Sequence, residues 1–307
     1  MTVSLLIKPQ DAPLSWREFC HKTPRFSIAL DGYVNDGPRF DQTNIHINFN
    51  HHENVSRLET RATCAQVLLA IRQGLFERFR VDGHPQAQVY VNDCDEDVCI
   101  SWFLLNNKHV AEQMINPLLN KLVAMEDFLD ATAGAYPLPK DLPALQELAW
   151  VFEPYRRFRL SGGLDRKHSD DFSGVITDIE NRIMRYIVGR SEKIILDTRY
   201  EKIGGGKNWT MIKEIGAQAR TGAFADGIKA YVAVRERPDG RWVYTIGRMS
   251  ILIPFNVPKI LEALNETEVC KNDRWGGGDI IGGSPRVNGS ALNPDKVVEI
   301  INKTKTS

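Results

Sequence analysis

Three groups of polar residues in the first half of the chain have types that could bind a metal ion. Each follows a short apolar segment, and the groups are Asp31, the run Asn50-His51-His52, and the loop that holds Asp93, Asp95 and Asp97. In open α/β sheets ligands gather outside the carboxyl ends of the strands, so we expect the three groups to converge. Carboxylates with imidazoles suit Mn²⁺ or Mg²⁺ better than a thiolate zinc site would. Two such ions about 3.5–4 Å apart would clamp a phosphate and activate water.

Each group also has an ordinary structural interpretation. An acidic loop is usually a solvated turn, and two adjacent histidines are more often polar surface residues than ligands. Asp127 and Asp130 lie three residues apart on one face of an expected helix. They could add a metal ligand, but an exposed acidic face is the interpretation we favour for them.

A glycine-rich stretch in the last third could bind phosphate. The segment from Gly276 to Arg286 has five glycines in its first eight positions, followed by Ser284 and Arg286. Glycine lets backbone N–H groups approach a phosphate, and arginine can grip it with two hydrogen bonds. The alternative is a structural turn. A second run, Gly204-Gly205-Gly206-Lys207, lacks the spacing and the Ser/Thr of a P-loop.

Nucleophilic catalysis has little support. The chain has no Gly-x-Ser-x-Gly elbow, and no cysteine has an evident histidine partner in the sequence.

The elements that must position the first-half groups alternate between strands and helices. Apolar and alternating patterns predict strands, and helical spacing of apolar residues with Thr63 as a cap predicts helices. The expected strands are 26–30, 44–49 and 88–91, and the expected helices are 63–75, 98–105 and 117–129. This alternation predicts an α/β fold with a mostly parallel sheet and flanking helices over residues 1–140.

The remainder of the chain changes character. Residues 141–192 read as a helical connector, with Ile176, Ile179, Ile183 and Ile187 on one helix face. Residues 193–307 read as a smaller α+β domain that binds substrate. Two strand-like runs flank Pro238-Asp239-Gly240, which is a hairpin signal. Helices are expected at 258–264 and from the cap Asn293 to Ile301, with the glycine-rich loop between them.

Composition excludes several classes of protein. The 307 residues carry 39 Lys+Arg against 39 Asp+Glu, and 42% are hydrophobic. A disordered chain would have fewer apolar residues, and a strongly basic nucleic-acid binder would have a positive excess. The five cysteines form no CxxC pair, which suits reduced thiols. The N-terminus lacks the features of a secretory signal, and the longest apolar run, from Val98 to Leu105, is too short to cross a bilayer. We therefore expect a cytoplasmic protein with no membrane partner.

Several of these segments resemble the DHH phosphoesterase family. The segment Ile47-Asn48-Phe49-Asn50-His51-His52, followed by Thr60-Arg61-Ala62-Thr63 and a helix, resembles the family's signature. Tyr90 to Leu105 looks like its DxD segment, and Phe26 to Gly32 looks like its strand ending in a lone metal-binding Asp. Ile228 to Ile301 resembles the DHH-associated C-terminal domain. The DxD-like segment follows the His-His segment here, although it usually precedes it, which implies a permuted order.

The resemblance implies a two-domain hydrolase with its site in the cleft between the domains. Its catalytic residues would be Asp31, His51, His52, Asp95 and Asp97, of which all but His52 would be metal ligands, and two Mn²⁺ or Mg²⁺ ions would be bound. His52 would be a ligand or a phosphate contact. Gly277, Gly278, Asp279, Ser284 and Arg286 would bind substrate. Asn50 stands where the family has Asp, and Asp279 stands where it commonly has His.

The sequence thus leads to one main function and two alternatives. The main function is hydrolysis of a phosphodiester or phosphoanhydride in a nucleotide-like substrate, another small phosphorylated substrate or a short oligonucleotide. The first alternative is a non-catalytic nucleotide or nucleic-acid binding protein derived from such an enzyme, because Asn50 and Asp279 depart from the family pattern. The second is a structural or partner-binding protein.

Overall fold

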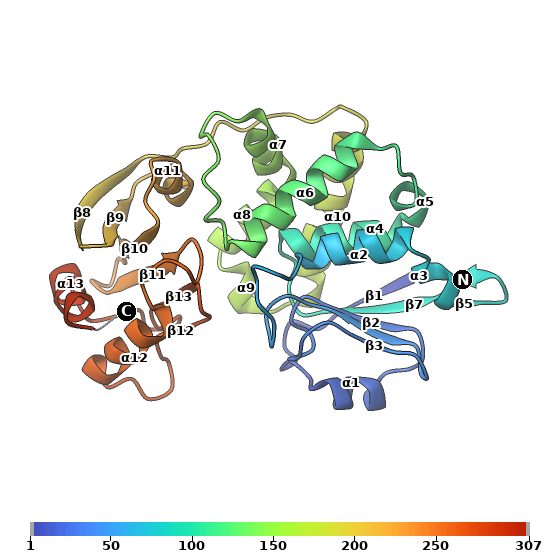
Figure 1. Cartoon of the computed structure of the whole chain (residues 1–307), viewed down its shortest axis with the longest axis horizontal. Coiled ribbons are helices and arrows are strands. Elements are labelled where there is room, and N and C mark those ends of the chain that lie inside the picture. Colours follow the sequence, from blue (N-terminus) through green and yellow to red (C-terminus); the bar gives the residue numbers. More distant parts are fainter. Residues whose placement is uncertain (1–2, 305–307) are drawn as a thin grey trace. The chain divides into compact units, whose positions relative to one another are not determined.

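The computed structural model describes residues 3–304, and the first two and last three residues of the expected domains lie outside that range. The chain forms two compact units (Figure 1). The first runs to Ala131 and resumes over Pro143–Ile194, and the second comprises Thr132–Leu142 and the chain from Ile195 onward. Both units mix helices and strands.

The first unit is built on a five-stranded sheet in the order β1-β7-β2-β4-β3. The pairings β1–β7, β7–β2 and β2–β4 are parallel, and β3–β4 is antiparallel. The strands are β1 (Val3–Ile7), β2 (Ser27–Leu30), β3 (Arg39–Asp41), β4 (His46–Phe49) and β7 (Ala87–Val91). Three of them fall within one to two residues of the strands that the sequence predicts. All four residues of β2 are buried, as the short apolar run indicates.

Helices cover both faces of this sheet. In Figure 1, α1 (Trp16–Lys22) lies on one face, and α2 (Thr63–Arg72), α4 (Glu96–Asn106) and α6 (Pro117–Ala131) lie on the other. Nine consecutive residues of α4, from Asp97 to Leu105, are buried, which explains its unbroken apolar sequence. Thr63 is the first residue of α2 rather than its cap, since the cap position is Ala62 and makes no side-chain hydrogen bond. The shorter elements are α3 (Leu75–Arg78), β5 (Arg80–Val81), β6 (His84–Pro85) and α5 (Lys108–Ala111).

The segment that the sequence indicates as a connector belongs mostly to the first unit. Its long helix, α10 (Ser169–Ile187), buries Ile176, Ile179 and Ile183 in the same core as α2 and α4. The predicted helix with isoleucines on one face is therefore confirmed. These isoleucines pack in the core of the first unit, and the helix does not serve as a link between two domains. The accompanying helices are α7 (Pro143–Val151), α8 (Glu153–Leu160) and α9 (Gly163–Arg166).

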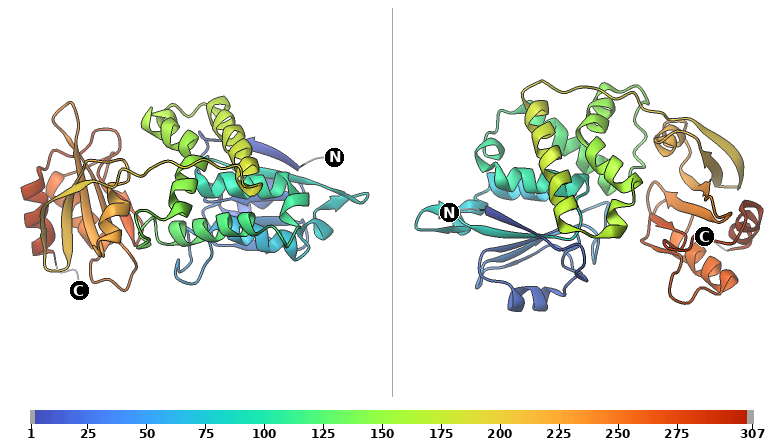
Figure 2. Two further views of the ribbon diagram at one scale, coloured as in Figure 1. Left: turned by 90° about the horizontal axis from the view of Figure 1, so that it is seen from above. Right: turned by 180° about the vertical axis from the view of Figure 1, so that it is seen from behind.

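The second unit has a six-stranded mixed sheet in the order β12-β13-β11-β10-β9-β8. Its hairpin, β10 (Ala230–Glu236) to β11 (Trp242–Arg248), confirms the Pro238-Asp239-Gly240 prediction, and Gly240 has φ 77°. Asn293 caps the last helix, as the sequence predicts, by accepting from the Lys296 N–H. The other elements are β8 (Tyr200–Gly206), β9 (Trp209–Glu214), α11 (Ala219–Ala225), α12 (Val257–Glu268), β12 (Gly276–Gly277), β13 (Ile281–Gly283) and α13 (Pro294–Lys303), and Figure 2 gives two further views.

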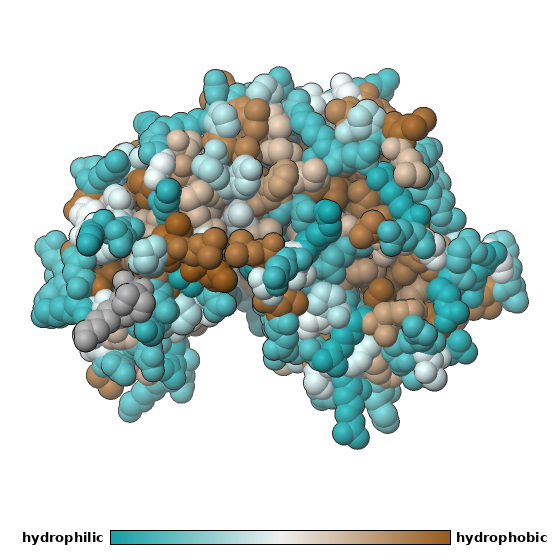
Figure 3. Space-filling model, in the orientation of Figure 1, coloured by the Kyte–Doolittle hydropathy of each residue, from teal (hydrophilic) through white to brown (hydrophobic). Residues whose placement is uncertain are grey.

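The visible surface is mainly hydrophilic, with apolar side chains in separate patches (Figure 3). Among the residues that the structure describes, no helix combines the length and apolar character that crossing a membrane requires.

Candidate metal centre

Four side chains of the first unit bring potential metal ligands together. One ligand atom from each of Asp31, His51, Asp97 and Asp130 lies within 4.8 Å of the others. The Nε2 atom of His51 is 3.6 Å from Asp31 Oδ1, 3.7 Å from Asp97 Oδ2 and 2.7 Å from Asp130 Oδ2. Asp31, His51 and Asp97 are 7%, 0% and 2% exposed, so this is an interior cluster.

The neighbouring ends of β2 and β4 place Asp31 and His51. Asp31 follows β2 directly, and its N–H donates to the carbonyl of Phe49, the last residue of β4. Its backbone has φ 46°, a left-handed conformation that is uncommon for residues other than glycine and that often occurs at functional sites. The parallel pairing of β2 with β4 therefore sets Asp31 beside His51, as expected for residues at adjacent carboxyl ends.

Asn50 holds the backbone of the two histidines. Its Oδ1 accepts from the N–H groups of His51 and His52, at 2.8 and 3.0 Å. Its Nδ2 donates to the carbonyls of Val34 and Asp36. Because the amide acts as donor and acceptor at once, a buried asparagine fits this position, and its Oδ1 is already occupied by two backbone N–H groups.

Asp97 is tied to the N-terminus of α2. Its two oxygens accept from the N–H groups of Thr63 and Cys64, at 2.7 and 2.6 Å. Asp127 on α6 accepts from the N–H of Ala62 at 2.7 Å. Two carboxylates therefore satisfy the first amides of a helix that has no side-chain cap of its own, and the helix dipole favours their charge.

Asp130 was not singled out as a ligand by the sequence, which favoured an exposed acidic face for Asp127 and Asp130. That interpretation is wrong, because Asp127 accepts from the N–H of Ala62 before α2, Asp130 belongs to the cluster, and the two side chains are only 18% and 24% exposed. Burial disfavours the Asp130 carboxylate, but the adjacent His51 and Arg57 outweigh this and lower its pKa to about 2. The three-residue spacing on one helix face was the available signal, and only the packing of α6 on α2 shows where that face points.

Several buried atoms of the cluster lack hydrogen-bond partners. Both ring nitrogens of His51 and Oδ2 of Asp130 have none among the described residues, although Nε2 and Oδ2 are close. A buried polar atom without a partner costs about 1–3 kcal/mol. Two donors that each lie about 2.1 Å from one ion, at right angles, are about 3 Å apart, close to the distances seen here. The cluster can therefore hold a metal ion.

The surrounding carboxyl groups add negative charge. Burial, and then repulsion from Asp31, raises the pKa of both Asp95 and Asp97 well above the usual value. Burial raises the pKa of Glu96 to about 7, and burial followed by repulsion from Glu96 raises that of Glu126. Carboxyl groups packed this closely favour a cation among them, because a cation stabilises their ionised forms.

His52 lies at the edge of the cluster. Its Nε2 is 3.0 Å from Asp31 Oδ1, and its Nδ1 is 2.6 Å from the guanidinium of Arg57. Because arginine only donates, Nδ1 accepts and Nε2 carries the proton that points at Asp31. Asp31, His51 and His52 form a second group of ligand atoms within 4.8 Å, which shares two members with the first.

Asp95 does not join the groups of ligand atoms among the described residues. It occupies the N-cap of α4, where its Oδ1 accepts from the Val98 N–H at 3.0 Å. The two aspartates of the acidic loop therefore have different roles. Asp95 caps α4, and Asp97, two residues later, points into the cluster. Sequence spacing alone treated the two as equivalent.

The glycine-rich stretch forms the β12–β13 hairpin of the second unit rather than an open loop between helices. A Cβ on Gly282 would meet Leu261 at 2.6 Å, so packing explains this glycine. Ser284 is buried, and its Oγ accepts from the Tyr244 N–H. These contacts support the structural alternative for part of the stretch. The other substrate-binding candidates, Gly277, Gly278, Asp279 and Arg286, are exposed.

An open cavity of about 680 Å³ lies in the first unit and is lined by residues of α2, of α6 and of the segment before α2, while the four residues of the cluster are not among its lining. Three arginines, Arg57, Arg61 and Arg72, are among its lining residues. Arg57 also contacts His52 and Asp130, so it joins the cavity to the cluster. Sequence reasoning did not assign these arginines a role, although they flank and enter the helix that follows the His-His segment.

A third group of ligand atoms lies elsewhere in the first unit. It consists of Cys20, Asp41 and His46, again within 4.8 Å of one another. The sequence shows no evident histidine partner for a cysteine, because these residues become neighbours only through folding.

No protein-family model matches the chain, and no curated protein matches it significantly.

Proposed function

We propose that this chain is a metal-dependent phosphoesterase related to the DHH phosphoesterases. The observation that carries the proposal is the buried His51 imidazole, which faces three carboxylates from different elements and whose Nδ1 has no hydrogen-bond partner in the described part of the chain. A cluster of three carboxylates and an imidazole favours Mn²⁺ or Mg²⁺. When bound, such an ion supplies Lewis-acid polarisation of a phosphoryl group and activation of water.

The chain's own residues orient the reaction partners. Asp31, Asp97 and Asp130 would hold the cation, and the α2 amides fix the Asp97 carboxylate in place. Arg57 fixes the tautomer of His52, whose Nε2 proton is directed toward the cluster. The arginines of the cavity would bind the phosphate of the substrate.

The family resemblance suggests the substrate class, and the volume of the cavity is compatible with it. The size of the cavity suits a nucleotide-like molecule or the end of a short oligonucleotide, since small-ligand sites occupy about 300–1,000 Å³. Asp31 belongs to both groups of ligand atoms, and a carboxylate has two oxygens that would allow it to bridge two ions. The family resemblance also predicts two bound ions. It predicts that substrate is bound by Gly277, Gly278, Asp279 and Arg286.

Hydrolysis of a chromogenic phosphodiester during a Mn²⁺ titration tests the proposal. We expect metal-dependent turnover that His51→Ala and Asp97→Asn abolish. The exposed residues His84 and Asp178 supply matched controls, so His84→Ala and Asp178→Asn should retain activity. Turnover that is independent of metal, or equal in all four variants, would overturn the proposal.

Asn50 motivates a non-catalytic alternative, because it departs from the family pattern. Its Oδ1 accepts from the N–H groups of His51 and His52, which supports a role in positioning the histidines rather than in binding the ion. Thermal stabilisation by Mn²⁺ and a nucleotide, without hydrolysis, would favour the binding protein over the enzyme.

A further inference from the structure

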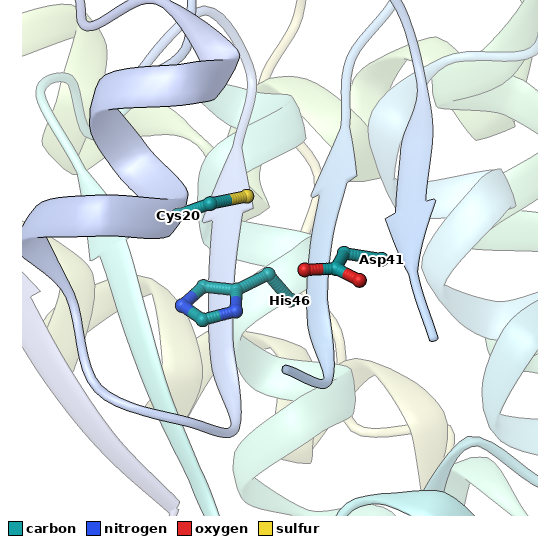
Figure 4. Close-up of side chains that lie close together, drawn as sticks. All are labelled: Cys20, Asp41 and His46. Carbon is teal, nitrogen blue, oxygen red and sulfur yellow. The ribbon is translucent and has the colours of Figure 1, made fainter. Parts of the chain in front are cut away.

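Cys20, Asp41 and His46 converge between α1 and the β3–β4 pair (Figure 4). Asp41 ends β3 and His46 begins β4, and the two are directly opposite each other in the antiparallel register. Cross-strand partners point to the same face of a sheet. Cys20 comes from α1, which packs on that face, because the ring of Phe19 meets the His46 ring edge-on at 5.7 Å. A helix and two neighbouring strands therefore place a thiol, a carboxylate and an imidazole together.

The imidazole of His46 is prepared to act as a ligand. The side chain is 1% exposed, and its Nε2 lies 3.2 Å from the Thr23 carbonyl oxygen. Since a carbonyl oxygen only accepts, Nε2 carries the hydrogen and Nδ1 keeps its lone pair. Nδ1 is buried and has no hydrogen-bond partner among the described residues. A histidine held through one nitrogen by a carbonyl, with the other free, is the usual arrangement of a metal-bound histidine.

The other two ligands are oriented and accessible. Asp41 accepts from the Thr43 N–H at 2.8 Å and from the Asn44 amide at 3.1 Å, which fixes its carboxylate. These hydrogen bonds, led by the one from Thr43, lower the pKa of Asp41 below its usual value. Cys20 is a free, half-buried cysteine, and burial followed by the Asp41 charge raises the pKa of its thiol. A cation would displace the thiol proton to solvent on binding.

We propose that Cys20, Asp41 and His46 form a zinc site, with Sγ, a carboxylate oxygen and Nδ1 as its three protein ligands. A thiolate with an imidazole favours Zn²⁺ over Mg²⁺ or Mn²⁺, and three protein ligands leave a fourth position for water. Cys20 and Asp41 are partly exposed, so solvent reaches that position. The bound ion links α1 to β3 and β4.

This site is separate from the centre at His51. His46 begins β4, whose four residues span roughly 10 Å, and His51 lies two residues beyond the other end of that strand. The donor sets also differ, since the His51 cluster contains no thiolate among the described residues. A metal that prefers sulfur therefore distinguishes the two sites.

Binding of Co²⁺ and Zn²⁺ to the full-length protein tests the proposal. We expect Co²⁺ to produce thiolate-to-metal charge-transfer absorption that Zn²⁺ abolishes by displacement. Cys20→Ser should eliminate this absorption and weaken zinc binding by at least about tenfold, measured against a chromophoric chelator. Cys270→Ser replaces another half-buried free cysteine and should leave both signals unchanged, and His51→Ala should leave the charge-transfer absorption unchanged.

The Asp41→Asn variant, which changes a second ligand, shows whether the effect of Cys20→Ser comes from lost zinc binding or from misfolding. Melting curves without metal should match wild type for Cys20→Ser and Asp41→Asn, while the increase in melting temperature caused by Zn²⁺ should be smaller than wild type in both. Absence of the charge-transfer band in wild type would overturn the zinc site, and so would its survival in Cys20→Ser. Loss of the band in His51→Ala would also overturn the proposal, because it would place the metal at the other centre.

Discussion

The Nε2 atom of His51 lies 2.7 Å from Oδ2 of Asp130, although one residue follows a strand of the sheet and the other lies near the end of α6. Neither atom has a hydrogen-bond partner among the described residues. The packing of α6 on α2 brings them together, and Asp31 and Asp97 complete the group. This relationship makes α6 part of the candidate centre and explains why its acidic residues are not on an exposed face.

Asn50→Asp should destabilise the protein rather than improve the site. The Asn50 amide nitrogen donates to the carbonyls of Val34 and Asp36, and an aspartate oxygen there would face acceptors without a proton to share. We expect a loss of about 1–3 kcal/mol in the free energy of unfolding, measured by urea denaturation. Unchanged stability with tighter Mn²⁺ binding would instead show that a carboxylate at this position joins the ligands.

Asp127→Ala should weaken α2 without removing a metal ligand. Its carboxylate accepts from the Ala62 N–H at the start of that helix, where no side-chain cap is present. Loss of a capping hydrogen bond costs about 1 kcal/mol. Urea denaturation should show this loss, whereas Asp178→Ala, an exposed control, should not. Equal midpoints for the two variants would contradict the capping role.

Stability without metal should fall as the pH rises. Burial, followed by repulsion from Glu96, raises the pKa of Glu126 above its ordinary value of 4.5. The folded protein then binds more protons than the unfolded chain above that value, so the free energy of unfolding decreases as the pH rises toward the folded-state pKa. The stabilisation that the protonated Glu126 contributes is complete below pH 4.5. It is lost as the pH rises through the higher pKa of Glu126 in the folded protein.

Glu126→Gln should therefore flatten the pH dependence of the metal-free protein. Urea denaturation between about pH 5 and 8, in the presence of a chelator, measures the slope. Glu112→Gln replaces an exposed glutamate of the same unit and should retain the wild-type slope. If Glu126→Gln also retained it, the buried Glu126 carboxyl would not be the titrating group.

Arg57→Ala should weaken substrate binding more than turnover of bound substrate. Arg57 lines the cavity and contacts His52. Loss of a charge-assisted hydrogen bond to a phosphate costs about 1.5–3 kcal/mol, which corresponds to an increase in KM of about tenfold or more. Steady-state kinetics should show this increase, and Arg78→Ala, at an exposed position, should leave KM unchanged. A fall in kcat alone would assign Arg57 to orienting His52 instead.

Local chemistry made much of the fold predictable. The strand Ala87–Val91 and the hairpin around Gly240 follow from apolar patterning and from turn residues that act over a few positions. The grouping of Asp31 with His51 was also predictable, because parallel strands bring their carboxyl ends to one edge of a sheet.

Long-range packing determined what the sequence could not show. Asp130 becomes a candidate ligand because α6 packs on α2, and His46 meets Cys20 because α1 packs on the face that β4 presents. Asp95 and Asp97 have the same chemistry, and only the start of α4 decides that one caps the helix while the other faces His51. The β12–β13 hairpin required strand pairing that a run of glycines does not indicate.

Anomalous diffraction from crystals grown with Mn²⁺ tests the central claim most directly. The account predicts a manganese peak within about 2.2 Å of ligand atoms from Asp31, His51, Asp97 and Asp130. In Asp130→Asn crystals the peak should weaken or disappear, while Asp178→Asn crystals should retain it. A well-ordered structure with manganese in solution and no peak among these four residues would contradict the account.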